Sequence, residues 1–193
     1  TQIELSGART VTELLALLPG LQATSQGDSG RVFIRGAEAR MTALYIDGVR
    51  VDSQDGLMLG GGAPWGLVSV AQVDRIEILR GASSAVYGSD AMGGVIQIFT
   101  RRGEEGFSPF VNFAVGSFNL QKFEAGFNGA QGRWDYALSV GRDDSDGFNT
   151  RPDLTHNPDH EASSRQSGSL RLGHQLSGAH HIELSALSSQ LDS

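Results

Sequence analysis

The second half of the chain alternates apolar and polar residues over five successive segments, and this alternation restricts the possible folds more than any other feature. A period of two places successive side chains on opposite faces of a β-strand. The polar positions include charged residues such as Lys122, Glu124 and Arg171. The apolar positions are Phe107, Val111, Phe113, Val115, Phe123, Ala125, Phe127, Trp134, Tyr136, Leu138, Val140, Leu170, Leu172, Leu176, Ile182, Leu184 and Ala186. A soluble sandwich would bury one face under a second sheet, whereas a membrane β-barrel has lipid outside and water or protein inside. The pattern therefore predicts antiparallel strands of a transmembrane β-barrel.

The links between these segments differ in length. Residues 129–132 and 177–180 form tight connections, whereas residues 142–166 form a long one. Outer-membrane barrels have short periplasmic turns and longer extracellular loops, so we expect residues 142–166 to be an extracellular loop. A barrel needs about eight strands or more, and an open sheet edge does not lie in lipid. We therefore expect these strands to be the first ones of a larger barrel, of which the chain is a fragment.

The first half of the chain has helix and hairpin signals instead. Thr10 and Glu13 have the spacing of a capping box, which predicts a helix that stops at the Pro-Gly pair before residue 21. Asp47-Gly48 lies between two apolar runs and predicts a two-residue hairpin, because glycine adopts positive φ without strain. These elements predict a compact domain that mixes helix and strand.

The stretch 73–102 is the last part of this first domain. It holds two short β patterns, residues 75–79 and 95–100, joined by a link rich in Gly, Ser and Ala. Such small side chains allow a backbone to approach another segment closely. We expect an α+β domain, truncated at its N-terminus, over residues 1–102, and barrel strands over residues 103–193.

Composition excludes several classes of protein. No apolar run approaches the ~18 residues of a membrane-spanning helix. The chain has no cysteine, so neither a disulfide framework nor a thiolate metal site is expected. Its formal net charge is −7, which disfavours nucleic acid as a partner.

Five motifs of the first half occur in a characteristic order and spacing. Together they resemble the plug domain of TonB-dependent outer-membrane receptors, and among these the cobalamin receptors most closely. The motifs are Leu-Leu-Pro-Gly at 17–20, Phe-Ile-Arg-Gly at 33–36, Tyr-Ile-Asp-Gly-Val-Arg at 45–50, Val-Asp-Arg-Ile-Glu-Ile-Leu-Arg-Gly at 73–81, and Ser-Ala-Val-Tyr-Gly-Ser-Asp-Ala-Met-Gly-Gly-Val-Ile at 84–96.

The resemblance implies a fold and a function. In this family a small plug domain lies inside a barrel of about 22 strands. The implied function is TonB-dependent import of a scarce ligand (cobalamin, an iron-siderophore or haem) across the outer membrane of a Gram-negative bacterium. The implied partners are TonB, through a segment that would precede Thr1, the ligand and outer-membrane lipid. The alternative is a passive or structural barrel without energy-coupled transport.

Two arginines, Arg35 and Arg80, each follow an apolar strand pattern and precede glycine. Buried guanidinium groups persist where carboxylates pair with them. The resemblance implies that both arginines face glutamates of the barrel wall, beyond residue 193, and help to hold the plug. The alternative is that they are solvated charges at strand ends.

Ligand contacts are expected on two loops of the first domain, residues 26–30 and 54–65. They offer polar groups together with apolar surface, as a pocket for a large amphipathic ligand does. Alternatively, the second loop is a linker whose apolar residues fold back on the domain. The candidate ligand-binding residues are Gln26, Asp28, Gln54, Asp55, Met58 and Trp65.

Acidic residues are dense in the long link 142–166. Carboxylates at this density suggest calcium, although the spacing does not fit an EF-hand because Arg142 would occupy the first position. The cobalamin receptors bind calcium in this region, but Asn149 stands here where one family carboxylate would be. The alternative is a solvated acidic loop. The candidate calcium ligands are Asp143, Asp144, Asp146, Asp159 and Glu161.

Catalytic motifs are incomplete. Residues 81–85 approach a Gly-x-Ser-x-Gly nucleophile elbow, but Ala85 replaces the last glycine, so a serine hydrolase is only a remote alternative. Gly60-Gly61-Gly62 is not followed by Gly-Lys-Ser/Thr, which excludes a phosphate-binding loop. We therefore expect a binding protein that is not an enzyme and requires no cofactor beyond a possible structural calcium.

Overall fold

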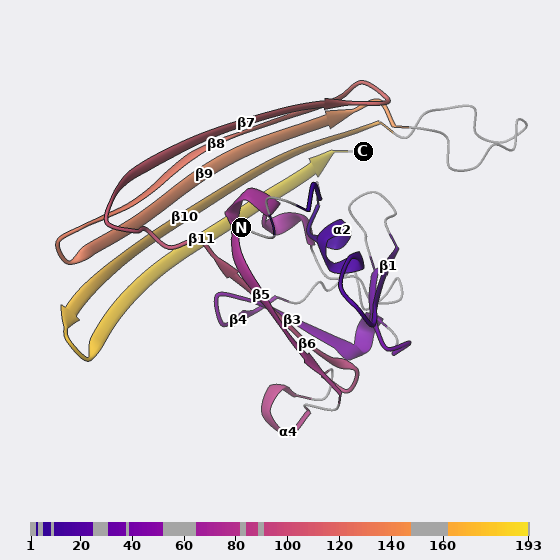
Figure 1. The fold of residues 1–193 in the computed structure, drawn as a ribbon, viewed down its shortest axis with the longest axis horizontal. Coiled ribbons are helices and arrows are strands. Elements are labelled where there is room, and N and C mark those ends of the chain that lie inside the picture. The colour runs from indigo at the N-terminus through magenta and orange to yellow at the C-terminus, as the bar shows by residue number, and fades with distance from the viewer. Residues whose placement is uncertain are drawn as a thin grey trace, which may run out of the picture. The chain divides into compact units, whose positions relative to one another are not determined.

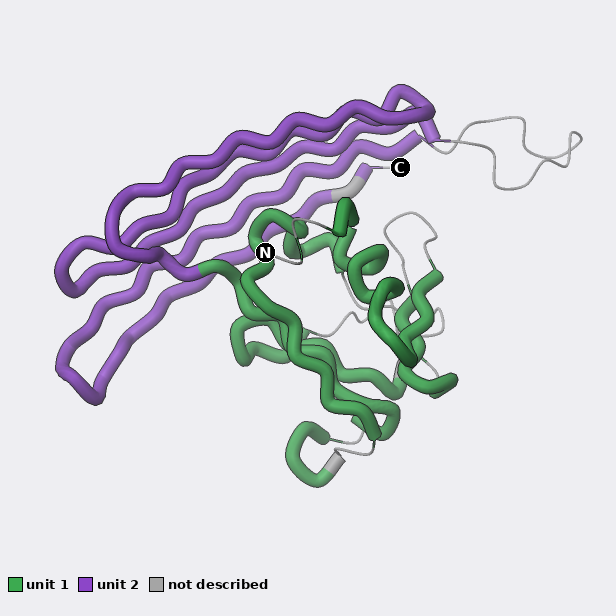
Figure 2. Tube along the Cα trace, viewed as in Figure 1, with its two compact units in different colours: residues 1–101 green, residues 102–193 purple. Residues whose placement is uncertain are grey.

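The computed structural model divides the chain into two compact units, residues 1–101 and 102–193, which are described separately (Figure 2). The sequence analysis places the boundary one residue later. No helix in the described part of the chain is long and apolar enough to cross a membrane. The residues that the structure describes are 3, 6–8, 10–24, 31–37, 39–51, 65–81, 84–88, 91–147 and 162–192.

The second unit is a five-stranded antiparallel sheet with the strand order β11-β10-β9-β8-β7 (Figure 1). Each strand has enough residues to cross the hydrocarbon layer of a bilayer, which takes about 9–11. The predicted antiparallel strands are confirmed. Their bounds are β7 (Gly106–Gly116), β8 (Leu120–Gln131), β9 (Trp134–Ser145), β10 (Ser163–Ser177) and β11 (His180–Asp192).

The register of this sheet gathers the apolar side chains on one face. Phe127 pairs with Leu138, Leu138 with Leu170, and Leu170 with Ala186, so the apolar positions of neighbouring strands lie side by side. This face is open: Phe113 is 68% exposed and Leu184 63%. The opposite face, called the polar face below, carries the charged residues of the alternation. One apolar and one polar face is what a barrel wall requires.

The predicted loop 142–166 is too long at both ends. Strand β9 continues to Ser145 and β10 begins at Ser163, because backbone pairing persists from Arg142↔Gln166 to Ser145↔Ser163. Side chains reinforce it: the Ser164 hydroxyl donates to Asp144 Oδ1 at 2.7 Å. Residues 146–162 remain as the connection. Strand pairing needs no apolar side chains. The prediction took these polar residues as part of the loop, and it therefore ended β9 too early and started β10 too late.

The first unit contains a four-stranded sheet of order β4-β3-β6-β5, in which β3 and β6 are parallel and the other neighbours antiparallel. Its buried core includes Leu15, Ile34, Leu44, Ile96 and Ile98. A separate antiparallel pair, β1 and β2, completes the strands. The elements are α2 (Val11–Ala16), β1 (Leu21–Thr24), β2 (Arg31–Ile34), η1 (Ala39–Met41), β3 (Thr42–Ile46), β4 (Val49–Arg50), η2 (Trp65–Leu67), η3 (Val70–Gln72), β5 (Val73–Arg80), α4 (Ser84–Tyr87) and β6 (Gly94–Thr100).

The predicted helix and hairpin are confirmed. Helix α2 begins after Thr10, whose hydroxyl accepts a hydrogen bond from the backbone N–H of Glu13 at 3.1 Å. Strands β3 and β4 are joined by Asp47 and Gly48, with φ of 48° and 82°. Both values lie in the left-handed region that a two-residue hairpin uses.

Two glycines where the link from β5 enters β6 allow a close approach of other segments, as their small size predicts. A Cβ on Gly93 would lie 2.7 Å from the Cβ of Ala37, and one on Gly94 would lie 2.5 Å from the carbonyl oxygen of Leu79. The N–H of Gly93 also donates to the carbonyl of Met41 at 2.8 Å. The two glycines therefore seat the start of β6 tightly in the first unit.

Candidate functional site

Arg35 and Arg80 lie at the same corner of the first unit, at the Pro19-Gly20 turn that follows α2. The Arg80 guanidinium donates to the carbonyl of Pro19 at 2.9 Å, and the backbone N–H of Arg35 donates to the carbonyl of Gly20 at 2.9 Å. Both residues are exposed, and Arg35 has a φ of 51°. Within the described residues neither side chain forms an ion pair with a carboxylate. The structure therefore brings the two residues to one corner, and the pairing of their side chains with barrel glutamates stays a prediction.

Trp65 does not lie on the surface as a ligand contact would. It belongs to η2, is only 6% exposed, and is part of the buried core. Its indole Nε1 is buried and has no hydrogen-bond partner among the described residues. For this residue the alternative interpretation holds, since burial of a large aromatic surface favours packing into the domain. The other candidate ligand residues lie outside the described residues: Gln26, Asp28, Gln54, Asp55 and Met58.

The candidate calcium ligands are not brought together where the structure describes them. Asp143 and Asp144 are consecutive in β9, so their side chains lie on opposite faces. Asp144 already accepts from Arg142 Nε at 2.7 Å. Asp146 follows the strand, while Asp159 and Glu161 lie outside the described residues. Among the described residues no group of three or more His, Asp or Glu side chains could hold a metal. Calcium stays a prediction.

Tyr87, in the fifth sequence motif, anchors α4 to the sheet of the first unit. Its ring packs edge-on against Tyr45 with centroids 5.4 Å apart. Its hydroxyl accepts from Gln97 at 2.9 Å, and its carbonyl accepts from Arg50 at 3.4 Å. One tyrosine thus joins three strands, which gives the motif a structural role that the sequence alone did not indicate.

Two charged residues of the edge strand β5, Arg75 and Glu77, lie on the same face of the first unit's sheet as Tyr45. The Arg75 guanidinium stacks 3.8 Å above the ring of Phe99 and donates to Glu77 at 2.8 Å. This hydrogen bond raises the pKa of Arg75 above its ordinary value. Charged side chains on an edge strand protect it from pairing with another chain.

The polar face of the second unit carries a charge cluster that the sequence analysis recorded only as part of the alternation. Arg171 Nη2 lies 2.5 Å from Glu183 Oε2, and Arg102 Nη2 lies 3.7 Å from the same oxygen. His181 Nε2 lies 3.7 Å from Asp135 Oδ2 and 3.8 Å from Glu183 Oε2. These five residues, Arg102, Asp135, Arg171, His181 and Glu183, are called the turn-end cluster, because they lie near the tight turns of the sheet.

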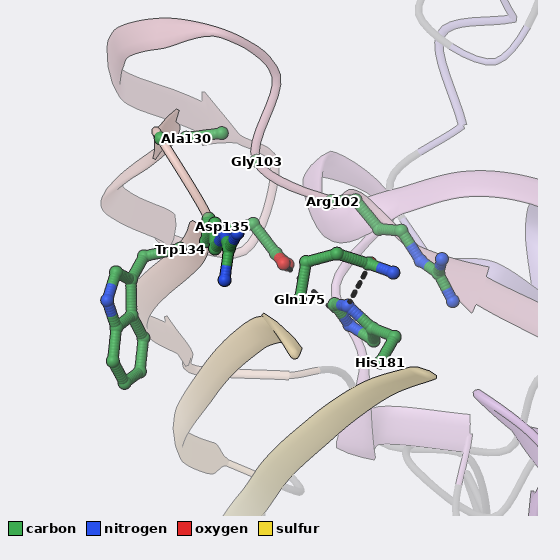
Figure 3. Close-up of a pocket in the computed structure, with 9 residues that line it drawn as sticks. Arg102, Gly103, Ala130, Trp134, Asp135, Gln175 and His181 are labelled. Carbon is green, nitrogen blue, oxygen red and sulfur yellow. Dashed lines mark hydrogen bonds and ion pairs between the residues drawn. The ribbon is translucent and has the colours of Figure 1, made fainter. Parts of the chain in front are cut away.

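The turn-end cluster borders an open hollow of about 630 Å³ (Figure 3). Its lining includes Arg102, Asp135 and His181 from the cluster, together with Arg133 and Gln175. Figure 3 shows Gln175 and His181 facing one another across a hydrogen bond of 3.2 Å. The hollow therefore combines hydrogen-bond donors and an acid at one end of the sheet.

A second pair of charges lies toward the other end of the polar face. Lys122 Nζ is 3.4 Å from Glu124 Oε1, with side chains only 15% and 8% exposed. Lys122 also stands opposite Asp143, which in turn stands opposite Arg165. Opposite charges on neighbouring strands stabilise the pairing. Charged residues at alternating positions were the sequence signal for both groups, except for Arg102, which precedes β7.

Comparisons with known proteins agree with this architecture. Residues 1–95 match the model of the TonB-dependent Receptor Plug Domain. The vitamin B12 transporter BtuB of Vibrio vulnificus (strain YJ016) is 39% identical over 102 residues, which is 51% of this chain and 16% of the relative. BtuB of Vibrio cholerae serotype O1 (strain M66-2) is 33% identical over 156 residues, which is 78% of this chain and 24% of the relative. The chain thus spans 16% to 24% of the length of these relatives.

Solved structures share the fold at lower sequence identity. The FrpB iron transporter from Neisseria meningitidis superposes with a TM-score of 0.76 at 22% identity, over 96% of this chain and 30% of that one. The siderophore receptor PirA from Acinetobacter baumannii gives 0.75 at 22% identity, over 95% and 29%. Both matches include the two units described above, and at this identity they establish the fold alone.

Proposed function

Because the chain belongs to the TonB-dependent receptors of the Gram-negative outer membrane, we propose that the receptor containing it imports a scarce ligand across that membrane. Its matched relatives are transporters rather than enzymes. The resemblance seen in the motifs is confirmed, and so are the plug domain and the antiparallel strands that it implied.

One observation carries the proposal: a plug domain over residues 1–95 precedes a sheet with one exposed apolar face. That face is lined by large side chains such as Phe107, 62% exposed, and Val111, 69% exposed. Water-soluble proteins rarely expose an apolar patch of this extent, whereas lipid covers it without cost. A plug followed by a barrel wall is what a gated importer needs.

Cobalamin is the ligand we propose. The relatives named as vitamin B12 transporters are 33% to 39% identical to this chain, whereas the siderophore receptor PirA is 22% identical. The second candidate is an iron-siderophore or haem. The ligand would contact the plug loops that include Gln54, Asp55 and Met58.

We further propose that TonB supplies the energy. A pull from the periplasm, driven by the proton gradient of the inner membrane, would rearrange the plug and open a path for the ligand. In this topology the tight turns at residues 132–133 and 178–179 lie on the periplasmic side. The connection 146–162 then lies outside the cell, as short turns and long loops do in this class of barrel.

Uptake in a deletion strain tests this function. The full-length receptor is expressed in a Gram-negative strain that lacks its own cobalamin receptor and needs cobalamin for growth. We expect receptor-dependent accumulation of labelled cyanocobalamin that stops when TonB is deleted or the proton gradient is collapsed.

Two other results would overturn parts of the proposal. If labelled ferric siderophore accumulates and cobalamin does not, the imported ligand is an iron-siderophore and not cobalamin. Accumulation that is unaffected by loss of TonB and of the gradient would favour the passive barrel.

A further inference from the structure

His181 lies between two carboxylates that come from different strands. Its Nε2 is 3.7 Å from Asp135 of β9 and 3.8 Å from Glu183 of β11. Between these strands lies Gly173 of β10, which stands opposite both acids in the register. A Cβ on Gly173 would collide with the Asp135 carboxylate. The glycine therefore leaves room for Asp135 to lean toward the imidazole.

The hydrogen bond to Gln175 determines where the imidazole takes up a proton. Gln175 Oε1 lies 3.2 Å from His181 Nδ1, and an amide oxygen only accepts, so this contact is a hydrogen bond in the tautomer that carries its hydrogen on Nδ1. In the neutral ring Nε2 then presents a lone pair to two carboxylate oxygens. Protonation occurs at Nε2 and turns this repulsive arrangement into an attractive one.

The charges of the turn-end cluster balance only while His181 is neutral. Asp135 and Glu183 are offset by Arg171 and Arg102. Arg133 lines the adjacent hollow and adds a further positive charge. A protonated His181 brings one more cation to Glu183, whose carboxylate already contacts two arginines.

Arg102 is the weaker of these two arginine contacts. Arg171 has a side chain only 5% exposed and lies 2.5 Å from Glu183, whereas the Arg102 side chain is 66% exposed and lies 3.7 Å away. An exposed pair is screened by water and contributes little, so it separates first when a competing cation appears. Arg102 is also the first residue of the second unit.

We propose that His181 is a proton-sensitive switch: its protonation releases Arg102 from Glu183 and loosens the segment that leads from the plug into the first barrel strand. Protonation of an imidazole requires acid, so the switch responds to acidification of the surroundings. The proposal depends on the family fold and not on which ligand is imported.

A spin label on the linker tests the switch in the full-length receptor, reconstituted in lipid nanodiscs. Glu104 is exposed and this chain has no cysteine. Glu104→Cys is therefore introduced into a full-length receptor in which any cysteine outside this chain is replaced by serine, which gives one labelling site. We expect the mobile fraction of the label to rise about threefold from about pH 7.5 to 5.5, the factor that the loss of one exposed ion pair allows. His181→Gln should hold the label at the low-mobility level at both pH values.

Two further variants make the result decisive. His180→Gln removes a histidine from the same strand but from the opposite face, and it should keep the pH response. Arg102→Gln should give high mobility at both pH values. A wild-type label without pH response, or a response that survives in His181→Gln, would overturn the proposal. Cobalamin uptake, measured in parallel, tests the proposed function separately, since either result can fail alone.

Discussion

The Asp47 carboxylate accepts two hydrogen bonds from Thr100, one from its backbone N–H at 2.9 Å and one from its hydroxyl at 2.6 Å. Asp47 lies in the hairpin turn between β3 and β4, and Thr100 is the last residue of β6. The backbone N–H of Asp47 also donates to the carbonyl of Ile98 at 2.9 Å. The turn thus secures the strand that leads out of the first unit.

Replacing Asp47 should loosen this end of the sheet. Asp47→Ala removes both acceptors and places alanine at a φ of 48°, so we expect a loss of about 2–4 kcal/mol of plug stability. Asp47→Asn tolerates the same φ and keeps one acceptor, and it should lose less than half as much. Hydrogen exchange at the Thr100 amide and urea unfolding of the plug measure both variants. Equal losses in the two variants would contradict this account.

Gly94 should be far less replaceable than Gly36, although both have positive φ. A Cβ on Gly94 would lie 2.5 Å from the Leu79 carbonyl and 2.8 Å from Ile34, whereas nothing lies within 4 Å of one on Gly36. We expect Gly36→Ala to cost about 1 kcal/mol from the backbone alone and Gly94→Ala at least about 3 kcal/mol, measured by urea unfolding. Similar costs would mean that the close approach at Gly94 relaxes freely.

Charge on the apolar face of the barrel strands should block assembly, while charge on the polar face should not. Leu138 is 37% exposed on the apolar face, and Ala137 is its neighbour on the other face. An arginine near the middle of the bilayer costs about 2–4 kcal/mol on the lipid side. Leu138→Arg should therefore lower the amount of heat-modifiable, folded receptor in the outer membrane, and Ala137→Arg should leave it near the wild-type level. A loss of folded receptor in Ala137→Arg but not in Leu138→Arg would mean that the face assigned to the barrel interior is the one that contacts lipid.

Reversing the charges of Arg35 and Arg80 should loosen the plug in the full receptor. Both arginines stand at the Pro19-Gly20 corner, so a double change to glutamate places two negative charges where glutamates of the barrel are expected. We expect several-fold greater entry of large antibiotics and reduced ligand uptake. The double change to lysine keeps the charges and should leave leakage near normal. Unchanged leakage in the glutamate variant would identify both residues as solvated charges.

Local sequence predicted those features that depend on neighbours along the chain. The Thr10 cap, the Asp47-Gly48 turn and the alternation of the barrel strands depend on a few consecutive residues, and all are found. Strand ends were harder to predict, because β9 is held to Ser145 by pairing with β10, whose residues are distant in the sequence. The burial of Trp65 could not be predicted for a related reason: whether a tryptophan beside a loop is exposed depends on the core that packs around it.

By itself, the sequence determined which side chains of the barrel strands face lipid, since alternation is a property of any extended backbone. Only the tertiary structure decided which of them meet. Asp135, His181 and Glu183 come together over Gly173 because hydrogen bonds between strands set one register among several that alternation allows. Register depends on contacts between distant segments, so no local pattern reveals it.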